Sequence, residues 1–439
     1  MDTDEQLTAR QFQEAGGVDD WRALAFGASA WFSTPSHTSG AALVRRVAEL
    51  AGSADRLPDM DLRASGVHVR IGTTGSPAFT LEDVAMARAI SAVAQDLGLA
   101  GDPSAVQTVQ LAIDALDKRA VMPFWRVGLD YEPMGDDDLV DPMRRDPAIW
   151  FQQQDQPRPL RNRIHVDVSR PHALAPDAVA AIRAAGGREK YAGAYYATLA
   201  DAEGNEADFV PLVPADELGE GPDTADWRVL FGAMTFYPTD VPRQAAELAA
   251  AVAGLADAAG LPLLVDLRPD GVTIDTGKDQ WEDERFGDLA RRIQAAARGM
   301  ALTADTTRLR FVQIGIDAVD IPVVRGVWRA VLGYEYDSRA GITDLYDPRR
   351  LNLPIFFQQM PASEDARRKQ RNRIHVDVFV PDDQARARID AALAAGGRIV
   401  YDAEAPEWWT LADPEGNEVD IAVSVGREEI WLAARARAD

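Results

Sequence analysis

Cysteine is absent from this 439-residue sequence, and histidine occurs only five times. The absence of cysteine excludes disulfides, thiolate metal sites and cysteine nucleophiles. Long apolar runs are also missing, and the first residues, MDTDEQLTARQF, are acidic and polar rather than typical of a signal peptide. These absences predict a soluble, cytoplasmic protein that has no membrane partner.

Basic residues are scarce relative to acidic ones. The sequence has 46 Lys and Arg residues against 70 Asp and Glu residues, which gives a formal net charge of −24. Such an acidic chain is a poor partner for nucleic acid or for an anionic membrane. Its 46% hydrophobic and 26% charged residues are ordinary globular composition. The length predicts two or more domains.

The sequence does contain a long internal repeat. The octapeptide RNRIHVDV occurs at 161–168 and again, unchanged, at 371–378. Other segments recur around it in the same order: VQLAIDALD and VQIGIDAVD, AIWFQQ and PIFFQQ, AAGGR twice, TLADAEGNEAD and TLADPEGNEVD, and DWRALAFGASAWF and DWRVLFGAMTFY. Ordered matches of this kind indicate a tandem duplication. Each repeat is roughly two hundred residues long, which is enough for two small domains.

The hydrophobic pattern favours an α+β fold in each repeat. The first part of a repeat is predicted as strand, helix, two strands and helix, with Thr80 and Asp83 in capping-box positions. The second part is predicted as strand, helix and strands, twice over. The predicted segments are two small α+β domains at 1–104 and 227–304, two strand–helix–strand domains at 105–213 and 305–439, and an acidic Pro/Gly linker at 214–226.

Strand alternation sorts the octapeptide into two faces. Ile164, Val166 and Val168 point to one side, while Arg163, His165 and Asp167 point to the other. The apolar side must pack against something, most simply the helices. The same sorting of the neighbouring strands predicts a polar pocket with one aromatic wall on the opposite side of a curved sheet.

The strand–helix–strand domains resemble the vicinal oxygen chelate superfamily, which includes glyoxalases, bleomycin-resistance proteins and extradiol dioxygenases. The FWRVGLDYE-like helix, the NRIHVDV strand and the DPEGNE turn carry this resemblance. It implies domains of two βαβββ modules curled around a ligand cavity, with metal ligands on the first and last strand of each module. The positions that match these ligand slots are Gln110, Gln152, His165 and Asp208 in the first repeat, and Gln313, Gln358, His375 and Asp420 in the second.

This set of residues departs from the usual ligands of the superfamily. One imidazole, one carboxylate and two amides form a poor site for Zn²⁺. A harder divalent ion suits oxygen donors better, so a divalent metal ion is one cofactor hypothesis. The resemblance also allows for members that bind drugs or metabolites without a metal.

The small α+β domains resemble pterin-4a-carbinolamine dehydratase through the segment from LVRRVAELAG to LEDVAMARAI. That family has a His-His-Pro turn and one further histidine. This sequence has Arg56 and Leu57 at the turn and Thr74 at the further position, and Gly260 and Leu261 precede the proline of the second copy. None of these residues can transfer protons near neutral pH as imidazole does. We therefore expect a scaffold, a dimerisation surface or a modified binding site without dehydratase activity.

Each candidate site residue also has a structural interpretation. His165 and His375 are either core histidines with satisfied hydrogen bonds or pocket residues that bind metal or act on a substrate. Asp208 and Asp420 are either solvated or catalytic carboxylates. Arg163 and Arg373 either form ion pairs or hold an anionic ligand. The aromatic rings of Trp150 and Phe356 serve either packing or ligand stacking.

The residues predicted to form the sites fall into three overlapping sets. The catalytic candidates are His165, His375, Asp208 and Asp420. The ligand-binding candidates are Gln110, Trp150, Gln152, Arg163, Gln313, Phe356, Gln358 and Arg373. The metal-ligand candidates are His165, Asp208, Gln110, Gln152, His375, Asp420, Gln313 and Gln358.

Three functions are compatible with these residues. The first is binding of a small organic molecule in polar and aromatic pockets, as in a resistance or sequestration protein. The second is a divalent-metal-dependent lyase, isomerase or dioxygenase that acts on vicinal oxygens. The third is 4a-hydroxytetrahydrobiopterin dehydratase, against which the missing histidines argue. The protein is expected to be a monomer with internal pseudo-symmetry or a homodimer.

Overall fold

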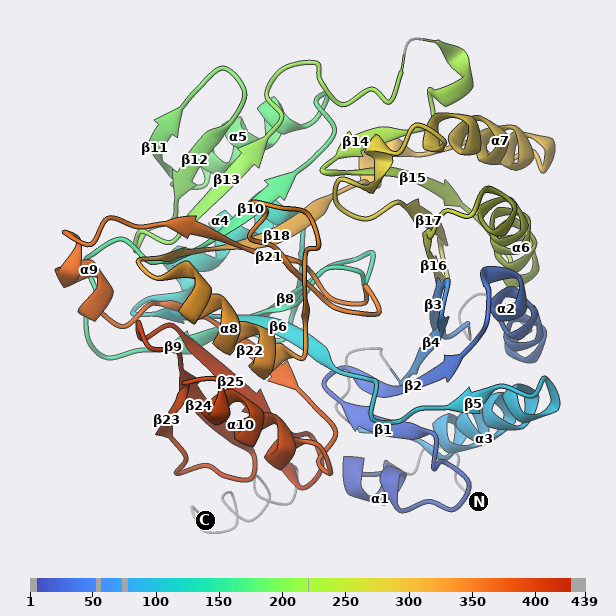
Figure 1. The fold of residues 1–439 in the computed structure, drawn as a ribbon, viewed down its shortest axis with the longest axis horizontal. Helices are drawn as coiled ribbons and strands as arrows, with labels where there is room; N and C mark the ends of the chain where they lie inside the picture. Colours follow the sequence, from blue (N-terminus) through green and yellow to red (C-terminus); the bar gives the residue numbers. More distant parts are fainter. Residues whose placement is uncertain (1–5, 53–56, 73–77, 220, 428–439) are drawn as a thin grey trace. The chain divides into compact units, whose positions relative to one another are not determined.

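The computed structural model describes residues 6–52, 57–72, 78–219 and 221–427. The chain forms two compact units, and each unit draws on both repeats. Unit 1 contains 1–107, 217–309 and 423–439, and unit 2 contains 108–216 and 310–422. The like domains of the two repeats are therefore grouped together. The predicted α+β class is confirmed for both units (Figure 1).

The two copies in unit 1 have the same main element order. The first copy consists of α1 (Ala9–Gln13), β1 (Trp21–Leu24), β2 (Gly27–Ser33), α2 (His37–Ala51), β3 (Asp59–Arg63), β4 (Gly66–Ile71), α3 (Leu81–Asp96) and β5 (Ala100–Gly101). The second copy consists of η2 (Pro222–Thr224), β14 (Arg228–Leu230), β15 (Gly232–Pro238), α6 (Pro242–Ala259), β16 (Leu264–Arg268), β17 (Gly271–Asp275), η3 (Gln280–Glu282), α7 (Phe286–Gly299) and η4 (Thr306–Arg308).

One continuous sheet joins these copies. Its described strands run in the order β1-β2-β4-β3-β16-β17-β15-β14, and β5 pairs with β2. The join is the antiparallel pair β3–β16, where Asp61 lies opposite Asp266. The helices α2, α3, α6 and α7 lie on one side of the sheet and bury their apolar faces against it (Figure 1). The predicted capping box of α3 is present, because Thr80 accepts from the backbone N–H of Asp83 and Asp83 accepts in return from that of Thr80.

Unit 2 contains four strand–helix–strand modules. The first repeat supplies β6 (Thr108–Ala115), α4 (Lys118–Leu129), β7 (Glu132–Met134), β8 (Asp138–Val140) and β9 (Ile149–Gln153), followed by β10 (Ile164–Ser169), α5 (Ala175–Ala184), β11 (Arg188–Ala192), β12 (Ala197–Ala200) and β13 (Glu206–Val210). The second supplies β18 (Phe311–Ala318), α8 (Ile321–Leu332), β19 (Glu335–Tyr336), β20 (Leu345–Tyr346) and β21 (Ile355–Gln359), followed by α9 (Asp365–Lys369), β22 (Ile374–Phe379), α10 (Ala385–Ala394), β23 (Arg398–Tyr401), β24 (Trp408–Ala412) and β25 (Glu418–Ala422).

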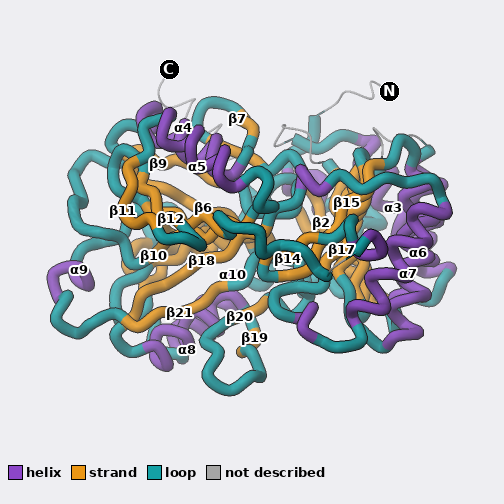
Figure 2. Tube along the Cα trace, turned by 90° about the horizontal axis from the view of Figure 1, so that it is seen from above, coloured by secondary structure: helices purple, strands orange, loops and turns teal. Residues whose placement is uncertain are grey.

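The modules of unit 2 pair across the repeats rather than within them. Among the described strands, one sheet has the order β11-β12-β13-β10-β18-β21-β20-β19, and the other has the order β23-β24-β25-β22-β6-β9-β8-β7. The second module of each repeat thus shares a sheet with the first module of the other repeat. The joins are the antiparallel pairs β10–β18 and β22–β6. Figure 2 shows α4 and α5 on one side of the strands of unit 2 and α8 on the other.

The octapeptide supplies the ties between the exchanged modules. The Asn162 side chain accepts from the backbone N–H of Arg373, and the Asn372 side chain accepts from that of Arg163. The Arg163 guanidinium donates to the side chain of Asn417 and to the carbonyl of Gly416, both in the DPEGNE turn of the other repeat. The RNR segment therefore recurs because each copy holds a module of the other repeat.

No helix in the described part of the chain is both long enough and apolar enough to cross a membrane.

Candidate functional site

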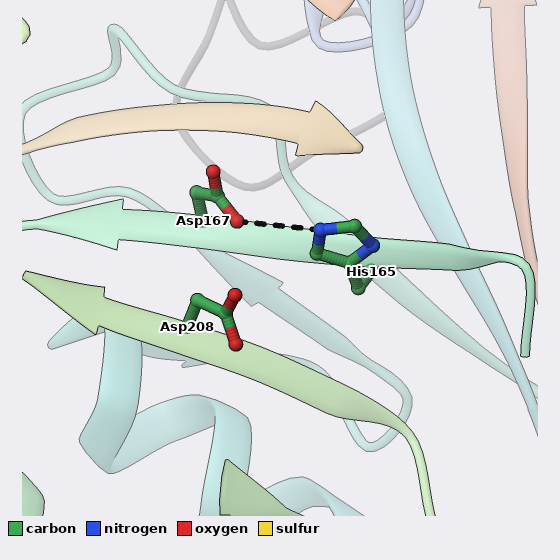
Figure 3. A group of neighbouring side chains, drawn as sticks. All are labelled: His165, Asp167 and Asp208. Atoms are coloured by element: carbon green, nitrogen blue, oxygen red, sulfur yellow. Dashed lines mark ion pairs between the residues drawn. The ribbon is translucent and has the colours of Figure 1, made fainter. Parts of the chain in front are cut away.

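The first candidate site lies on the sheet that contains β10. His165 and Asp167 are two residues apart on this strand and point to the same face, as strand alternation predicts. Asp208 on the adjacent strand β13 pairs in register with Asp167. Figure 3 shows the three side chains together, with the ion pair between Nε2 of His165 and Oδ1 of Asp167 at 3.6 Å. We call His165, Asp167 and Asp208 site 1.

The second repeat forms an equivalent group on the other sheet. His375 and Asp377 alternate on β22, and Asp420 on β25 lies in register with Asp377. Nε2 of His375 is 3.5 Å from Oδ1 of Asp377 and 3.9 Å from Oδ2 of Asp420. We call these three residues site 2. In each site one ligand atom from every residue lies within 4.8 Å of the others.

Both sites are largely buried, and burial changes their ionisation. Burial raises the pKa of Asp208 and of Asp420, even though the nearby histidine and a threonine hydroxyl favour the charged form in each case. Burial alone would lower the pKa of His375, but the carboxylates of Asp377, Asp420 and Asp114 outweigh it and raise that pKa. A positive charge close to these carboxylates would therefore stabilise their ionised form.

The donor set of each site fits a divalent cation. Two carboxylates and one imidazole per site are ligands that hard and intermediate divalent ions accept. The Oδ1 atoms of Asp208 and Asp420 are buried and have no hydrogen-bond partner among the described residues. A buried acceptor without a partner is costly unless something else binds it. The acidic neighbours Glu206 and Glu418 are not candidates, since each is held by an arginine at 2.7 Å.

The grouping of site residues by repeat was wrong. The exchanged pairing places Gln110 opposite Asp377 and Gln313 opposite Asp167, so each glutamine lies opposite the site aspartate of the other repeat. Gln313 donates to Oδ2 of Asp167 at 2.8 Å, whereas Gln110 donates to Oδ1 of Asp138 at 3.3 Å. Because the two copies of the motif are nearly identical, the sequence alone does not show which repeat supplies the neighbouring strand of each sheet.

The outer strands are exchanged in the same way. Trp150 and Gln152 lie on the sheet of site 2, and Phe356 and Gln358 lie on the sheet of site 1. The ring of Phe356 packs edge-on against that of His165, with centroids 5.7 Å apart. Each site brings a second aspartate, Asp167 or Asp377, beside the predicted histidine and aspartate.

The expected ligand-binding role of Arg163 and Arg373 is replaced by a structural one. Arg163 is buried and donates to the carbonyls of Arg367 and Gln370, in addition to the DPEGNE turn. Arg373 makes the corresponding bonds to Asn205, Gly204 and Leu160. Acceptor atoms of the protein thus bind the guanidinium groups that the sequence offered as holders of an anionic ligand.

Asp167 and Asp377 are the site residues that the candidate sets omitted. Alternation already placed Asp167 on the face of His165, but the predicted ligand sets do not include it. Its membership of the site follows from the parallel pairing with β13, which brings the Asp208 carboxylate beside it. The sequence shows a His-x-Asp strand followed by a second strand with an aspartate. It does not show that these two strands pair in parallel with the two aspartates in register.

A pair of partly or fully exposed aromatic side chains lies at the hairpin next to each site. Tyr191 and Tyr196 have ring centroids 4.8 Å apart, and their equivalents Tyr401 and Trp408 are stacked at 6.3 Å. Partial burial, the neighbouring Tyr191 and the carboxylate of Asp208 raise the pKa of Tyr196. Tyr196 directly precedes β12, on which Thr198 lies in register with Asp208 of site 1. Sequence reasoning did not single out these pairs.

The turn positions in unit 1 that the dehydratase resemblance singled out are structural where they are described. Leu57 is buried, Gly260 ends α6 in the left-handed conformation, and Leu261 packs in the core. Arg56 and Thr74 lie outside the described residues.

Comparison with known proteins agrees with the two kinds of domain. Residues 110–210 and 313–422 match the family model of the glyoxalase-like domain, and residues 3–93 match that of pterin 4 alpha carbinolamine dehydratase. The chain therefore contains two regions similar to the glyoxalase-like domain and, in its first part, a region similar to the dehydratase. Both resemblances found in the sequence are confirmed.

Solved structures give distant matches. Glyoxalase I from Zea mays is 8% identical with a TM-score of 0.37, and the match covers 74% of this chain and 95% of that one. BphC, a halotolerant catechol dioxygenase, is 10% identical with a TM-score of 0.20, and the match covers 72% of this chain and 85% of that one. No curated protein matches the sequence.

Proposed function

We propose that unit 2 is a divalent-cation-dependent centre that binds and transforms small organic molecules through their oxygen atoms. The observation that carries this proposal is the His/Asp/Asp group, present twice, in which buried oxygens of Asp208 and Asp420 have no hydrogen-bond partner among the described residues. The residues that would hold the cation are His165, Asp167 and Asp208 in site 1 and their equivalents in site 2. A bound cation supplies Lewis-acid polarisation of the ligand oxygens.

The surrounding residues define the kind of molecule that fits. The rings of Phe356 and His165 pack at nearly right angles, and Tyr191 on β11 and Tyr196, which directly precedes β12, form an aromatic pair beside the strands next to Asp208. Planar groups bind well against aromatic faces. We therefore propose a ligand with a planar, partly apolar body and vicinal oxygens. This chemistry corresponds to a lyase, an isomerase or a dioxygenase.

The test is a Mn²⁺ titration of the metal-free chain, followed by electron paramagnetic resonance. We expect two Mn²⁺ ions per chain, one ion in either Asp208→Asn or Asp420→Asn, and none in the double variant. Asp177→Asn, which removes an exposed carboxylate at the start of α5, is the matched control and should still bind two. Retention of both ions in the double variant would contradict the proposed sites.

A second candidate function is metal-free binding of the same kind of molecule. Its supporting observation is that His375 lies within 4 Å of the carboxylates of Asp377, Asp420 and Asp114, so a protonated imidazole could itself neutralise them. If the wild-type chain binds no Mn²⁺, this function replaces the first one. Quenching of tyrosine and tryptophan fluorescence by planar oxygen-bearing compounds would then report binding at the aromatic pairs.

A further inference from the structure

Sites 1 and 2 differ at the residue opposite the histidine. In site 1, His165 pairs in register with Gly315 on β18, and Gly315 pairs with Phe356 on β21. In site 2, His375 pairs with Ala112 on β6, and Ala112 pairs with Trp150. The two repeats thus place a hydrogen atom and a methyl group at equivalent positions beside the imidazole.

The imidazole of His165 occupies the space that a side chain at Gly315 would need. A Cβ built on Gly315 would lie well inside van der Waals contact of Cε1 and Nε2 of His165, and 2.7 Å from Cζ of Phe356. These are the ring atoms next to Asp167. The backbone of Gly315 is not in the left-handed region, so this glycine is needed for space and not for its backbone angles.

The imidazole of His375 lies in different surroundings. Ala112 fills the equivalent space with its methyl group, and Nδ1 of His375 is 3.8 Å from Oδ1 of Asp114. Nε2 faces Asp377 and Asp420. His375 thus has carboxylates on both of its nitrogens, whereas His165 has the edge of Phe356 against its ring.

We propose that Gly315 is a positioning residue that sets where the His165 imidazole lies, and that it makes site 1 different from site 2 in metal affinity. The part of this inference that concerns affinity rests on the proposed function. The part that concerns the ring position does not, because it follows from packing alone. Residues that orient a ligand typically change metal affinity by roughly tenfold to a hundredfold when they are replaced.

The ring position is tested by NMR of the imidazole nitrogens at one fixed pH. The chain has five histidines, so His165→Gln and His375→Gln assign the two signals of interest. We expect different signals for His165 and His375 in the wild type. Gly315→Ala should move the His165 signals and leave those of His375 in place. Gly254→Ala is the matched control, because a Cβ there meets nothing within 4 Å.

The reciprocal variant keeps the test decisive if Gly315→Ala does not fold. Ala112→Gly removes a methyl group and creates no overlap, at a cost of about 1 kcal/mol for glycine in a strand. It should shift the His375 signals towards those of His165. Unchanged His375 signals in Ala112→Gly, or unchanged His165 signals in a folded Gly315→Ala chain, would overturn the inference about position.

The affinity is tested by Mn²⁺ titration with one site removed. In an Asp420→Asn chain only site 1 should bind, and adding Gly315→Ala should weaken that binding by roughly tenfold or more. A moved His165 signal with unchanged Mn²⁺ affinity would overturn the part that concerns affinity. If the wild type binds no Mn²⁺, the proposed metal function and this affinity difference both fail, while the NMR result decides the ring position separately.

Discussion

Units 1 and 2 both combine two copies of a domain, but they do so in different ways. In unit 1 each copy keeps its own strands, and the copies meet edge to edge at β3 and β16. In unit 2 the copies exchange modules, so that each sheet contains strands of both repeats. The same duplication has thus produced a side-by-side junction in one unit and an exchanged junction in the other.

The polar groups at these junctions are used differently. At the junction of unit 1, Arg268 pairs with Asp61 at 2.8 Å and Arg63 pairs with Asp266 at 2.7 Å. Nδ1 of His68 also donates to the Asp61 carboxylate, so the buried charges there neutralise one another. In unit 2 the Oδ1 atoms of Asp208 and Asp420 have no hydrogen-bond partner among the described residues. Neutralised charges indicate a structural role, and unneutralised ones indicate a binding role.

The largest expected effect comes from the arginines that tie the exchanged modules. Arg163→Ala removes the guanidinium donors to the carbonyls of Arg367, Gln370 and Gly416, so it should lower the free energy of unfolding by about 3–5 kcal/mol. Arg183→Ala is the control, because the side chains of Arg183 and its ion-pair partner Glu189 are 47% and 45% exposed and such a pair is worth about 0–1 kcal/mol. Urea unfolding measures both. Equal losses would contradict the exchanged junction.

A pair of aspartate substitutions should separate the two units. Although burial opposes ionisation, Arg268, His68 and Arg63 hold the pKa of Asp61 well below its ordinary value. Asp61→Asn should therefore cost about 3–5 kcal/mol at neutral pH without changing Mn²⁺ binding.

Asp208→Asn should show the opposite behaviour. Burial raises the pKa of this carboxyl group, so the neutral amide should leave stability unchanged or increased while one Mn²⁺ ion is lost. Thermal unfolding without metal and a Mn²⁺ titration provide the two readouts. A strongly destabilised Asp208→Asn chain would show that this aspartate is structural, as Asp61 is.

A smaller, pH-dependent effect is expected at the edge of the site 2 sheet. Burial and the neighbouring Asp137 raise the pKa of Asp138 to about 6. The folded state favours the protonated form of Asp138. Ionisation of this side chain therefore destabilises the fold as the pH rises from the ordinary pKa of an aspartate towards 6 and above. Asp138→Asn should add about 1 kcal/mol of stability above pH 7 and progressively less towards pH 4, after allowance for partial exposure. Thermal unfolding across this range measures it, and the exposed Asp136→Asn should show no such trend.

The smallest expected effect is no effect at all. Unit 1 should not dehydrate a pterin-4a-carbinolamine, because the sequence has no histidine at the positions where the dehydratase family has them. The absorbance change of the pterin substrate should proceed at the buffer rate. Faster turnover would show that unit 1 is catalytic and would remove the contrast between the units.

Strand alternation and repeat matching predicted much of this architecture from the sequence. His165 and Asp167 share a face because side chains alternate along a strand, and Thr80 and Asp83 form a capping box because the spacing suits one. The exchanged pairing could not be predicted. Gln110 and Gln313 belong to nearly identical strands, so pairing within or between repeats satisfies the same local chemistry. The difference between Gly315 and Ala112 is visible in the sequence, but it acquires meaning only from the register with His165 and His375.

The most direct test of the central claim is a crystal of the chain grown with Mn²⁺ and measured at the manganese absorption edge. The account predicts two anomalous peaks per chain, one among His165, Asp167 and Asp208 and the other among the equivalent residues of site 2. Because the modules are exchanged, Gln313 should lie beside the first peak and Gln110 on the sheet of the second. Peaks elsewhere, or none at occupancies that the titration would require, would contradict the claim that unit 2 holds two cation sites.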